Sequence, residues 1–132
     1  MIGVVLVSHG PLADGLRQAA EMIMGPQEAL AVLGLDPAQE MDKYRADLES
    51  AVKSVDSGEG VVVLADLFGG SPANTAAYVL GPNVEVLCGC NLPMLIETLG
   101  SRAYGDLKSV TTGALQAAAE GALRLADVLQ NG

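Results

Sequence analysis

Basic and aromatic residues are scarce in this sequence. It has seven Lys and Arg against 16 Asp and Glu, a formal net charge of −9, one Phe, three Tyr and no Trp. The basic side chains are scattered from Arg17 to Arg124 and form no cluster. Because phosphate neutralisation requires clustered Lys and Arg, nucleic-acid binding is excluded. An acidic surface instead favours encounter with a partner that carries a basic face.

Metal-binding and redox residues are equally few, since the chain has two Cys and one His. Cys88 and Cys90 are too close in sequence for an ordinary disulfide, and a four-ligand zinc site needs more Cys or His than the chain contains. On a strand, both would face the same side. We interpret them as small buried apolar residues, and we expect no metal and no cofactor.

Long uninterrupted apolar segments are absent too. Residues 67–84 carry no charge, but glycine, proline and asparagine divide them into pieces too short to span a bilayer. No basic segment precedes the first apolar run, so a secretory signal is not predicted and a cytoplasmic location is expected. The 132 residues contain no internal repeat or linker, which predicts one domain over residues 1–132.

Four short apolar runs predict buried strands, at residues 2–7, 29–35, 60–65 and 84–88. None of them alternates cleanly between apolar and polar residues, which is typical of a parallel sheet covered on both faces. Segments with helical spacing lie between the runs. This order predicts an α/β fold with an open, mainly parallel sheet in strand order 2-1-3-4, right-handed crossovers and helices on both faces.

Local residues predict where the helices begin and end. Gly25 is expected to stop the first helix, Asp36 to cap the second, and Ser71 to cap a third that Gly81 closes. The alanine-rich tail, residues 107–129, carries one apolar stripe and predicts a helix. That helix either covers one face of the sheet or packs on a partner.

Two polar residues follow strands 1 and 3, where a sheet of this order binds its ligands. His9, the single histidine, follows the first strand, and Asp66 follows the third. A carboxylate that accepts the Nδ1 proton, at roughly 2.6 to 3.2 Å, leaves Nε2 bare and nucleophilic. The alternatives are a structural or surface histidine and an aspartate that only caps a loop.

A glycine-rich turn also follows the third strand. Gly69, Gly70 and Ser71 precede a helix expected to start at Pro72, so free amides and the positive end of the helix dipole would face the same crevice and hold an anion. Ser71 alternatively serves only as an N-cap. No Lys follows the turn, which excludes a nucleotide-binding P-loop.

Taken together, one imidazole, one acid and one anion-holding turn predict a site that accepts a phosphoryl group on nitrogen and passes it on. Hydrolysis is disfavoured, because no paired second carboxylate, metal cluster or cationic clamp accompanies these motifs.

Three segments resemble the enzyme IIA component of the mannose-type bacterial sugar phosphotransferase system. They are Val-Ser-His-Gly at residues 7–10, Ala-Asp-Leu-Phe-Gly-Gly-Ser-Pro-Ala-Asn at 65–74 and Cys-Asn-Leu-Pro-Met-Leu-Ile-Glu-Thr-Leu at 90–99. The second and third segments are specific to this family, and the similarity in length and element order runs to about residue 101.

The resemblance implies a phosphotransferase that works as a phosphocarrier. His9 would be phosphorylated on Nε2 by the protein HPr and would pass the group to an enzyme IIB. Asp66 would orient the ring, and Ser71 with the amides of Gly69 and Gly70 would hold the phosphoryl oxygens. The sugar is phosphorylated downstream, by IIB with its membrane permease partners, so this chain would not bind it.

The resemblance also implies a homodimer in which a C-terminal strand crosses to the other subunit, although here the tail predicts helix. Because the chain stops at Gly132, the IIB partner is expected to be a separate polypeptide.

Three other functions remain open. A phosphoryl donor for a dihydroxyacetone kinase shares the strand-end Ser-His. A small tetrapyrrole metal chelatase has a His-Gly after its first strand, but normally binds metal through a second His. A sensory domain would be phosphorylated on His9 only as a signal. The segments at 65–74 and 90–99 favour the sugar system.

Overall fold

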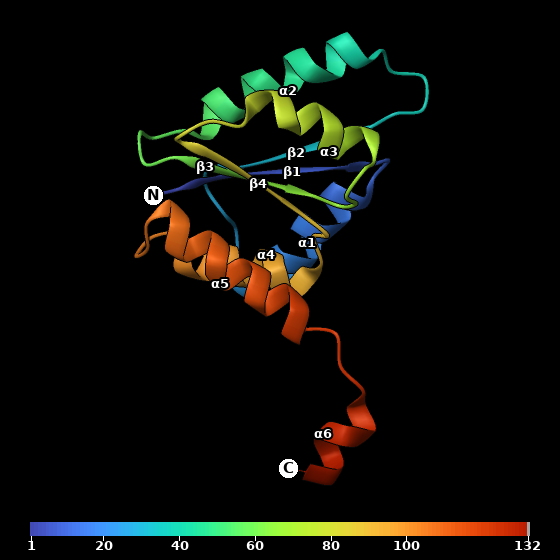
Figure 1. Cartoon of the computed structure of the whole chain (residues 1–132), viewed down its shortest axis with the longest axis vertical. Helices are drawn as coiled ribbons and strands as arrows, with labels where there is room; N and C mark the ends of the chain where they lie inside the picture. The colour runs from blue at the N-terminus through green and yellow to red at the C-terminus, as the bar shows by residue number, and fades with distance from the viewer. Residues whose placement is uncertain (132) are drawn as a thin grey trace.

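The chain folds around a four-stranded parallel sheet. We analysed a computed structural model, which describes residues 1–131. The sheet has the order β2-β1-β3-β4 and consists of β1 (Gly3–His9), β2 (Leu30–Leu35), β3 (Val61–Ala65) and β4 (Val84–Cys88) (Figure 1). The predicted fold class and strand order are therefore confirmed. β1 continues two residues past the predicted end, so that His9 is itself the last residue of the strand.

Helices cover both faces of this sheet. The helices described within residues 1–131 are α1 (Leu12–Met24), α2 (Met41–Val55), α3 (Ser71–Ala76), the 3₁₀-helix η1 (Ala77–Val79), α4 (Leu92–Ser101), α5 (Leu107–Glu120) and α6 (Leu125–Asn131). α2 and α3 lie on one face, and α1, α4 and α5 lie on the other (Figure 1). No helix within residues 1–131 combines the length and the apolar character that crossing a membrane requires.

The strand side chains divide into two hydrophobic clusters. On β1, Val4 and Leu6 pack on the side of α1, α4 and α5, whereas Val5 and Val7 pack on the side of α2 and α3. All four are at most 1% exposed. Burial on both faces explains why the apolar runs do not alternate with polar residues.

Two predicted helix starts are wrong. α2 begins at Met41 rather than after Asp36, because Asp36 closes a turn in which its Oδ1 accepts the amide of Ala38 at 3.0 Å. α3 has Gly70 at its N-cap, and Ser71 is the first helical residue, without a capping side-chain hydrogen bond. The polar residue before a proline marks a turn in both places, but the chain enters the helix at another residue.

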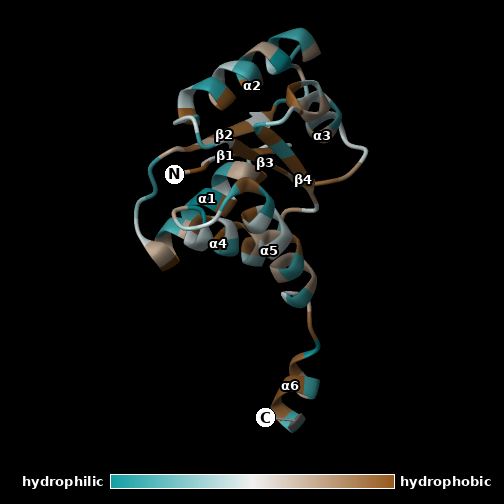
Figure 2. Cartoon of the chain, turned by 60° about the vertical axis from the view of Figure 1, so that its left-hand side comes forward, coloured by the Kyte–Doolittle hydropathy of each residue, from teal (hydrophilic) through white to brown (hydrophobic). Residues whose placement is uncertain are grey.

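The tail forms two helices instead of one. Asn91 donates from Nδ2 to the carbonyl of Ala118 at 3.1 Å, and α5 ends two residues later, with Gly121 as its C-cap. Val110 and Ala114 of α5 are buried. α6 extends away from the body of the molecule (Figures 1 and 2), and its apolar residues Leu125 and Val128 are exposed. Up to residue 131 the tail contains no strand.

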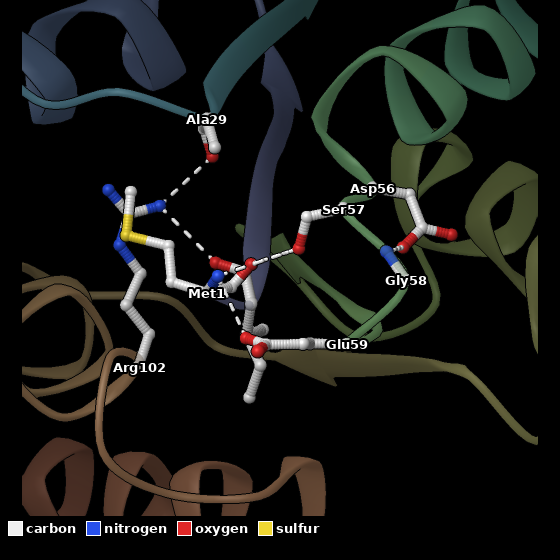
Figure 3. Close-up of polar contacts among 8 residues, drawn as sticks. Met1, Ala29, Asp56, Ser57, Gly58, Glu59 and Arg102 are labelled. Atoms are coloured by element: carbon white, nitrogen blue, oxygen red, sulfur yellow. Dashed lines mark hydrogen bonds and ion pairs between the residues drawn. The ribbon is translucent and has the colours of Figure 1, made fainter.

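The amino ends of the strands are held by a buried arginine. Arg102 is 2% exposed, and its guanidinium donates to the carbonyl oxygens of Ile2, Glu28 and Ala29 and to Oε1 of Gln27. Figure 3 shows the contact between Arg102 and Ala29. Burial lowers the pKa of this guanidinium. Since these acceptors precede or begin β1 and β2, Arg102 joins the loop after α4 to the edge of the sheet opposite His9.

Candidate functional site

The backbone around His9 is held on both sides. Ser8 is buried, and its Oγ accepts the amide of Ala13 in α1 at 2.8 Å and donates to the carbonyl of Gly10 at 3.2 Å. Gly34 on β2 lies against the same carbonyl, where a side chain would collide with the oxygen of Gly10. The strand end that carries the imidazole is thereby fixed to α1 and β2.

Asp66 meets His9 across the boundary between β1 and β3. The two strands pair in register, with Val7 opposite Ala65, and the amide of Asp66 continues the ladder to the carbonyl of Val7 at 3.2 Å. Asp66 Oδ2 then accepts the backbone N–H of His9 at 3.0 Å and lies 2.8 Å from ring Nδ1. The expected separation of these two side chains is confirmed.

The carboxylate is largely enclosed, whereas the imidazole is open. The side chain of Asp66 is 9% exposed and that of His9 is 52% exposed. Within residues 1–131, Asp66 Oδ1 is buried and has no hydrogen-bond partner. Both hydrogen bonds that the carboxylate accepts therefore come from His9, and none comes from a helix amide, as a capping aspartate would require.

The pKa of Asp66 lies below its ordinary value of 3.8. Burial raises the pKa, but the hydrogen bonds from the backbone and the ring of His9, together with the charge of the ring, lower it by more. The side chain is therefore a carboxylate near neutral pH. A carboxylate on Nδ1 favours the tautomer in which Nδ1 carries the proton and Nε2 is unprotonated.

The glycine-rich turn lies against Cε1 and Nε2 of the ring. The amide of Gly70 donates to the carbonyl of Leu67 at 3.2 Å, which closes the turn before α3. The hydrogen bonds within residues 1–131 leave the amides of Gly69 and Ser71 without a protein acceptor. His9, Asp66 and the turn are therefore brought together at the carboxyl ends of β1 and β3, as the sequence predicted.

Sequence analysis missed Ser8 and Gly34. Ser8 lies within the recognised Ser-His-Gly motif, but a hydroxyl that accepts an amide five residues later belongs to no standard capping pattern. Gly34 interrupts the second apolar run, and a glycine inside a strand often marks a close backbone approach, which here is made by Gly10. That interruption was the signal available in the sequence.

The two cysteines lie on different sides of the sheet, so the same-side prediction is wrong. Cys88 packs against the cluster under α2 and α3, whereas Cys90 packs against the cluster on the other face. β4 ends at Cys88, and Gly89 has a φ of +88°, which breaks the alternation of a strand. Burial, followed by the charge of Asp66, raises the pKa of Cys90 to about 12, which leaves an inert thiol.

Metal ligands do not gather in the described part of the chain. Residues 1–131 contain no group of three His, Cys, Asp or Glu side chains that could hold a metal ion.

The fold and the site together define a class of protein, namely small parallel α/β domains with a carboxylate-held histidine at the switch point of the sheet. A family model described as "PTS system fructose IIA component" matches residues 3–115. The chain belongs to this family, the mannose-type enzyme IIA components of the phosphotransferase system, and the resemblance found in the sequence is confirmed.

Curated relatives match much of this chain. The "PTS system mannose-specific EIIAB component" of Escherichia coli (strain K12) is 34% identical over 103 residues, which are 76% of this chain and 32% of that protein. This chain thus spans about a third of the length of that relative. The "PTS system fructose-specific EIIA component" of Bacillus subtilis (strain 168) is 29% identical over 112 residues, 83% of this chain and 77% of that protein.

Solved structures share the fold closely. The phosphotransferase system component EIIA from Streptococcus agalactiae superposes with a TM-score of 0.86 at 28% identity and covers 96% of this chain and 99% of its own. The mannose/sorbose specific IIA subunit from Enterococcus faecalis has a TM-score of 0.84 at 26% identity, with 93% of both chains covered.

Proposed function

We propose that this protein is a phosphocarrier of a sugar phosphotransferase system. His9 accepts a phosphoryl group on Nε2 from HPr and passes it to an enzyme IIB component for sugar uptake. The observation that carries this proposal is the 2.8 Å distance between His9 Nδ1 and Asp66 Oδ2 at the carboxyl edge of the sheet. Family membership supports it.

The transfer needs only a nucleophilic nitrogen and fixed charges. The Nε2 lone pair forms a bond to phosphorus while the bond between phosphorus and the donor atom of HPr breaks, and the donor atom keeps that electron pair. The proton stays on Nδ1, so the phosphorylated ring carries a positive charge that the carboxylate of Asp66 stabilises. In the transfer to enzyme IIB, an atom of IIB forms the bond to phosphorus while the bond between phosphorus and Nε2 breaks, and Nε2 keeps that electron pair.

The glycine-rich turn is the proposed holder of the phosphoryl oxygens. Gly69 and Ser71 have amides free of protein acceptors within residues 1–131, and Ser71 is exposed at the start of α3. Gly70 lines the same space, but its amide already donates to Leu67. We assign the oxygen contacts to the amides of Gly69 and Ser71 and to the hydroxyl of Ser71.

The open position of the ring supports transfer between proteins. His9 is half exposed, and the neighbouring Leu67 and Phe68 are 58% and 77% exposed, so a partner's surface has access to the ring. The net charge of −9 favours partners with basic docking faces. A single domain over residues 1–132, a homodimer and a cytoplasmic location complete the proposal.

Labelling tests this function directly. Incubation with phosphoenolpyruvate, enzyme I and HPr is expected to add one acid-labile, base-stable phosphoryl group, and His9→Ala is expected to remove it. Circular dichroism of His9→Ala checks that the fold persists. Labelling that survives the substitution would rule out His9 as the acceptor.

A second step separates the phosphocarrier from a sensory domain. The phosphorylated protein, freed of HPr, is mixed with an enzyme IIB of the mannose type. Loss of the label from His9 with its appearance on IIB is expected. Retention of the label on His9 would contradict the carrier function while leaving phosphorylation itself intact.

A further inference from the structure

Gly70 has a backbone conformation that does not require glycine. Its φ is −78° and its ψ is 162°, an extended geometry that any residue adopts. The preceding Gly69 differs, because its φ of +84° lies in the left-handed region that favours glycine. The backbone of Gly70 therefore does not itself require glycine.

A side chain at Gly70 would meet the imidazole of His9. A β-carbon built on Gly70 would lie 2.6 Å from Cε1 and 3.2 Å from Nε2 of the ring. The first distance is shorter than real contacts allow, so either the ring or the turn would have to move. The turn is restrained by the hydrogen bond from the amide of Gly70 to Leu67 and by the start of α3.

The ring has little freedom to yield while it keeps its present partner. Asp66 Oδ2 lies 2.8 Å from Nδ1, the ring nitrogen bonded to Cε1. A shift of the ring away from a new β-carbon would change the geometry of this hydrogen bond. Asp66 and Gly70 thus both restrain the imidazole, one by a hydrogen bond and the other by contact.

We propose that Gly70 is a positioning residue that fixes the orientation of His9 by having no side chain. This inference rests on the proposed function for its consequence, because it places Nε2 beside the turn assigned to the phosphoryl oxygens. Any side chain at position 70 displaces the ring and weakens the contact of Nδ1 with Asp66. The ring then loses its single tautomer, and the phosphoryl-accepting nitrogen is misplaced.

The first test measures the ring itself. In Gly70→Ala, the ¹⁵N shifts of the His9 ring are expected to change from one dominant tautomer, with the proton on Nδ1, to a mixture. Gly81→Ala is the matched control, because Gly81 has no positive φ and open space around its missing β-carbon. Phosphorylation by HPr is expected to slow about tenfold or more in Gly70→Ala, since small displacements of reacting groups have effects of this order. Ring shifts and rates equal to those of Gly81→Ala would overturn the proposal.

A double-mutant cycle tests the contact without any partner protein. Gly70→Ala is expected to lower the melting temperature of the wild-type protein. In a His9→Ala background it is expected to leave that temperature unchanged or raise it, because alanine restricts the unfolded chain and no ring remains to collide with. An equal change in both backgrounds would overturn the proposal. If Gly70→Ala fails to fold alone but folds with His9→Ala, the coupling is shown directly.

The outcome of these two tests does not depend on whether the proposed function is correct. An unphosphorylated wild-type His9 would contradict the phosphocarrier, but the ring tautomer and the coupling between positions 9 and 70 would still decide the role of Gly70.

Discussion

One oxygen of Asp66 holds His9 twice. Oδ2 accepts the backbone N–H at 3.0 Å and lies 2.8 Å from ring Nδ1, so the carboxylate fixes both the strand end and the imidazole. The other oxygen, Oδ1, is buried without a partner in the described chain. Burying a carboxylate that has hydrogen bonds to only one residue costs free energy. That cost is offset where the carboxylate stabilises a positive charge on the same residue, such as the charge that a phosphorylated His9 ring carries.

Asp66→Asn is expected to slow phosphorylation of His9 about 100-fold, within the range by which acid–base partners contribute. The amide removes the negative charge that stabilises the phosphorylated ring. Its oxygen takes the position of Oδ2, because the backbone N–H of His9 needs an acceptor there, and a neutral amide oxygen holds the Nδ1 proton more weakly than a carboxylate does. The rate of label transfer from HPr, measured by rapid quench, checks this prediction.

The control for that substitution is Asp47→Asn, which removes an equal charge from α2, where Asp47 pairs with Lys43 at 3.1 Å. Its rate is expected to stay within about twofold of wild type, as for a surface substitution. Equal rates for Asp66→Asn and Asp47→Asn would show that Asp66 is only a loop residue.

The lowered pKa of Asp66 also predicts that the stability of the folded protein depends on pH. Its pKa in the folded protein lies below the ordinary 3.8, so the unfolded chain binds the proton more readily. The stability that Asp66 contributes is therefore fully present above pH 3.8 and is lost as the pH falls through the folded value. The difference in free energy of unfolding between wild type and Asp66→Asn is therefore expected to shrink as the pH falls below 3.8.

Denaturant unfolding at a series of pH values measures this difference. Exposed carboxylates such as Asp106, whose pKa is also lowered, are present in both proteins and cancel. A difference that stays constant from pH 4 to pH 2, or that grows over this range, would contradict the sign derived for Asp66.

The fold was predictable because its strands are nearly pure apolar runs. A run such as Val61–Ala65, buried on both faces, is typical of the interior of a parallel sheet. Helix starts were less predictable, since Asp36 and Ser71 each precede a proline that fits a turn as well as a first helical residue. The end of α5 has a local signal in Gly121, its C-cap, which the long apolar stripe of residues 107–129 outweighed in the prediction of one helix.

The pair of His9 and Asp66 was predictable because neighbouring parallel strands place their last residues at one edge. The contacts that position the pair were not. Ser8 acts through a hydroxyl turned into the protein, and Gly70 acts through a contact that depends on the rotamer of His9. Neither property follows from residue type and spacing.

Ser8→Ala is expected to destabilise the protein by about 1–3 kcal/mol, because the amide of Ala13 loses its acceptor in a buried position. It is also expected to broaden or shift the ¹⁵N ring signals of His9, since Ser8 ties the backbone on both sides of that residue to α1 and the loop.

The control for this substitution is Arg102→Met. It removes buried hydrogen bonds at the opposite edge of the sheet and lowers the free energy of unfolding by a similar amount or more. Its ring signals are expected to match wild type. Denaturant unfolding measures the loss of stability in both variants, and ¹⁵N spectra measure the state of the His9 ring. Ring signals that respond equally to both substitutions would show that Ser8 supports only the fold.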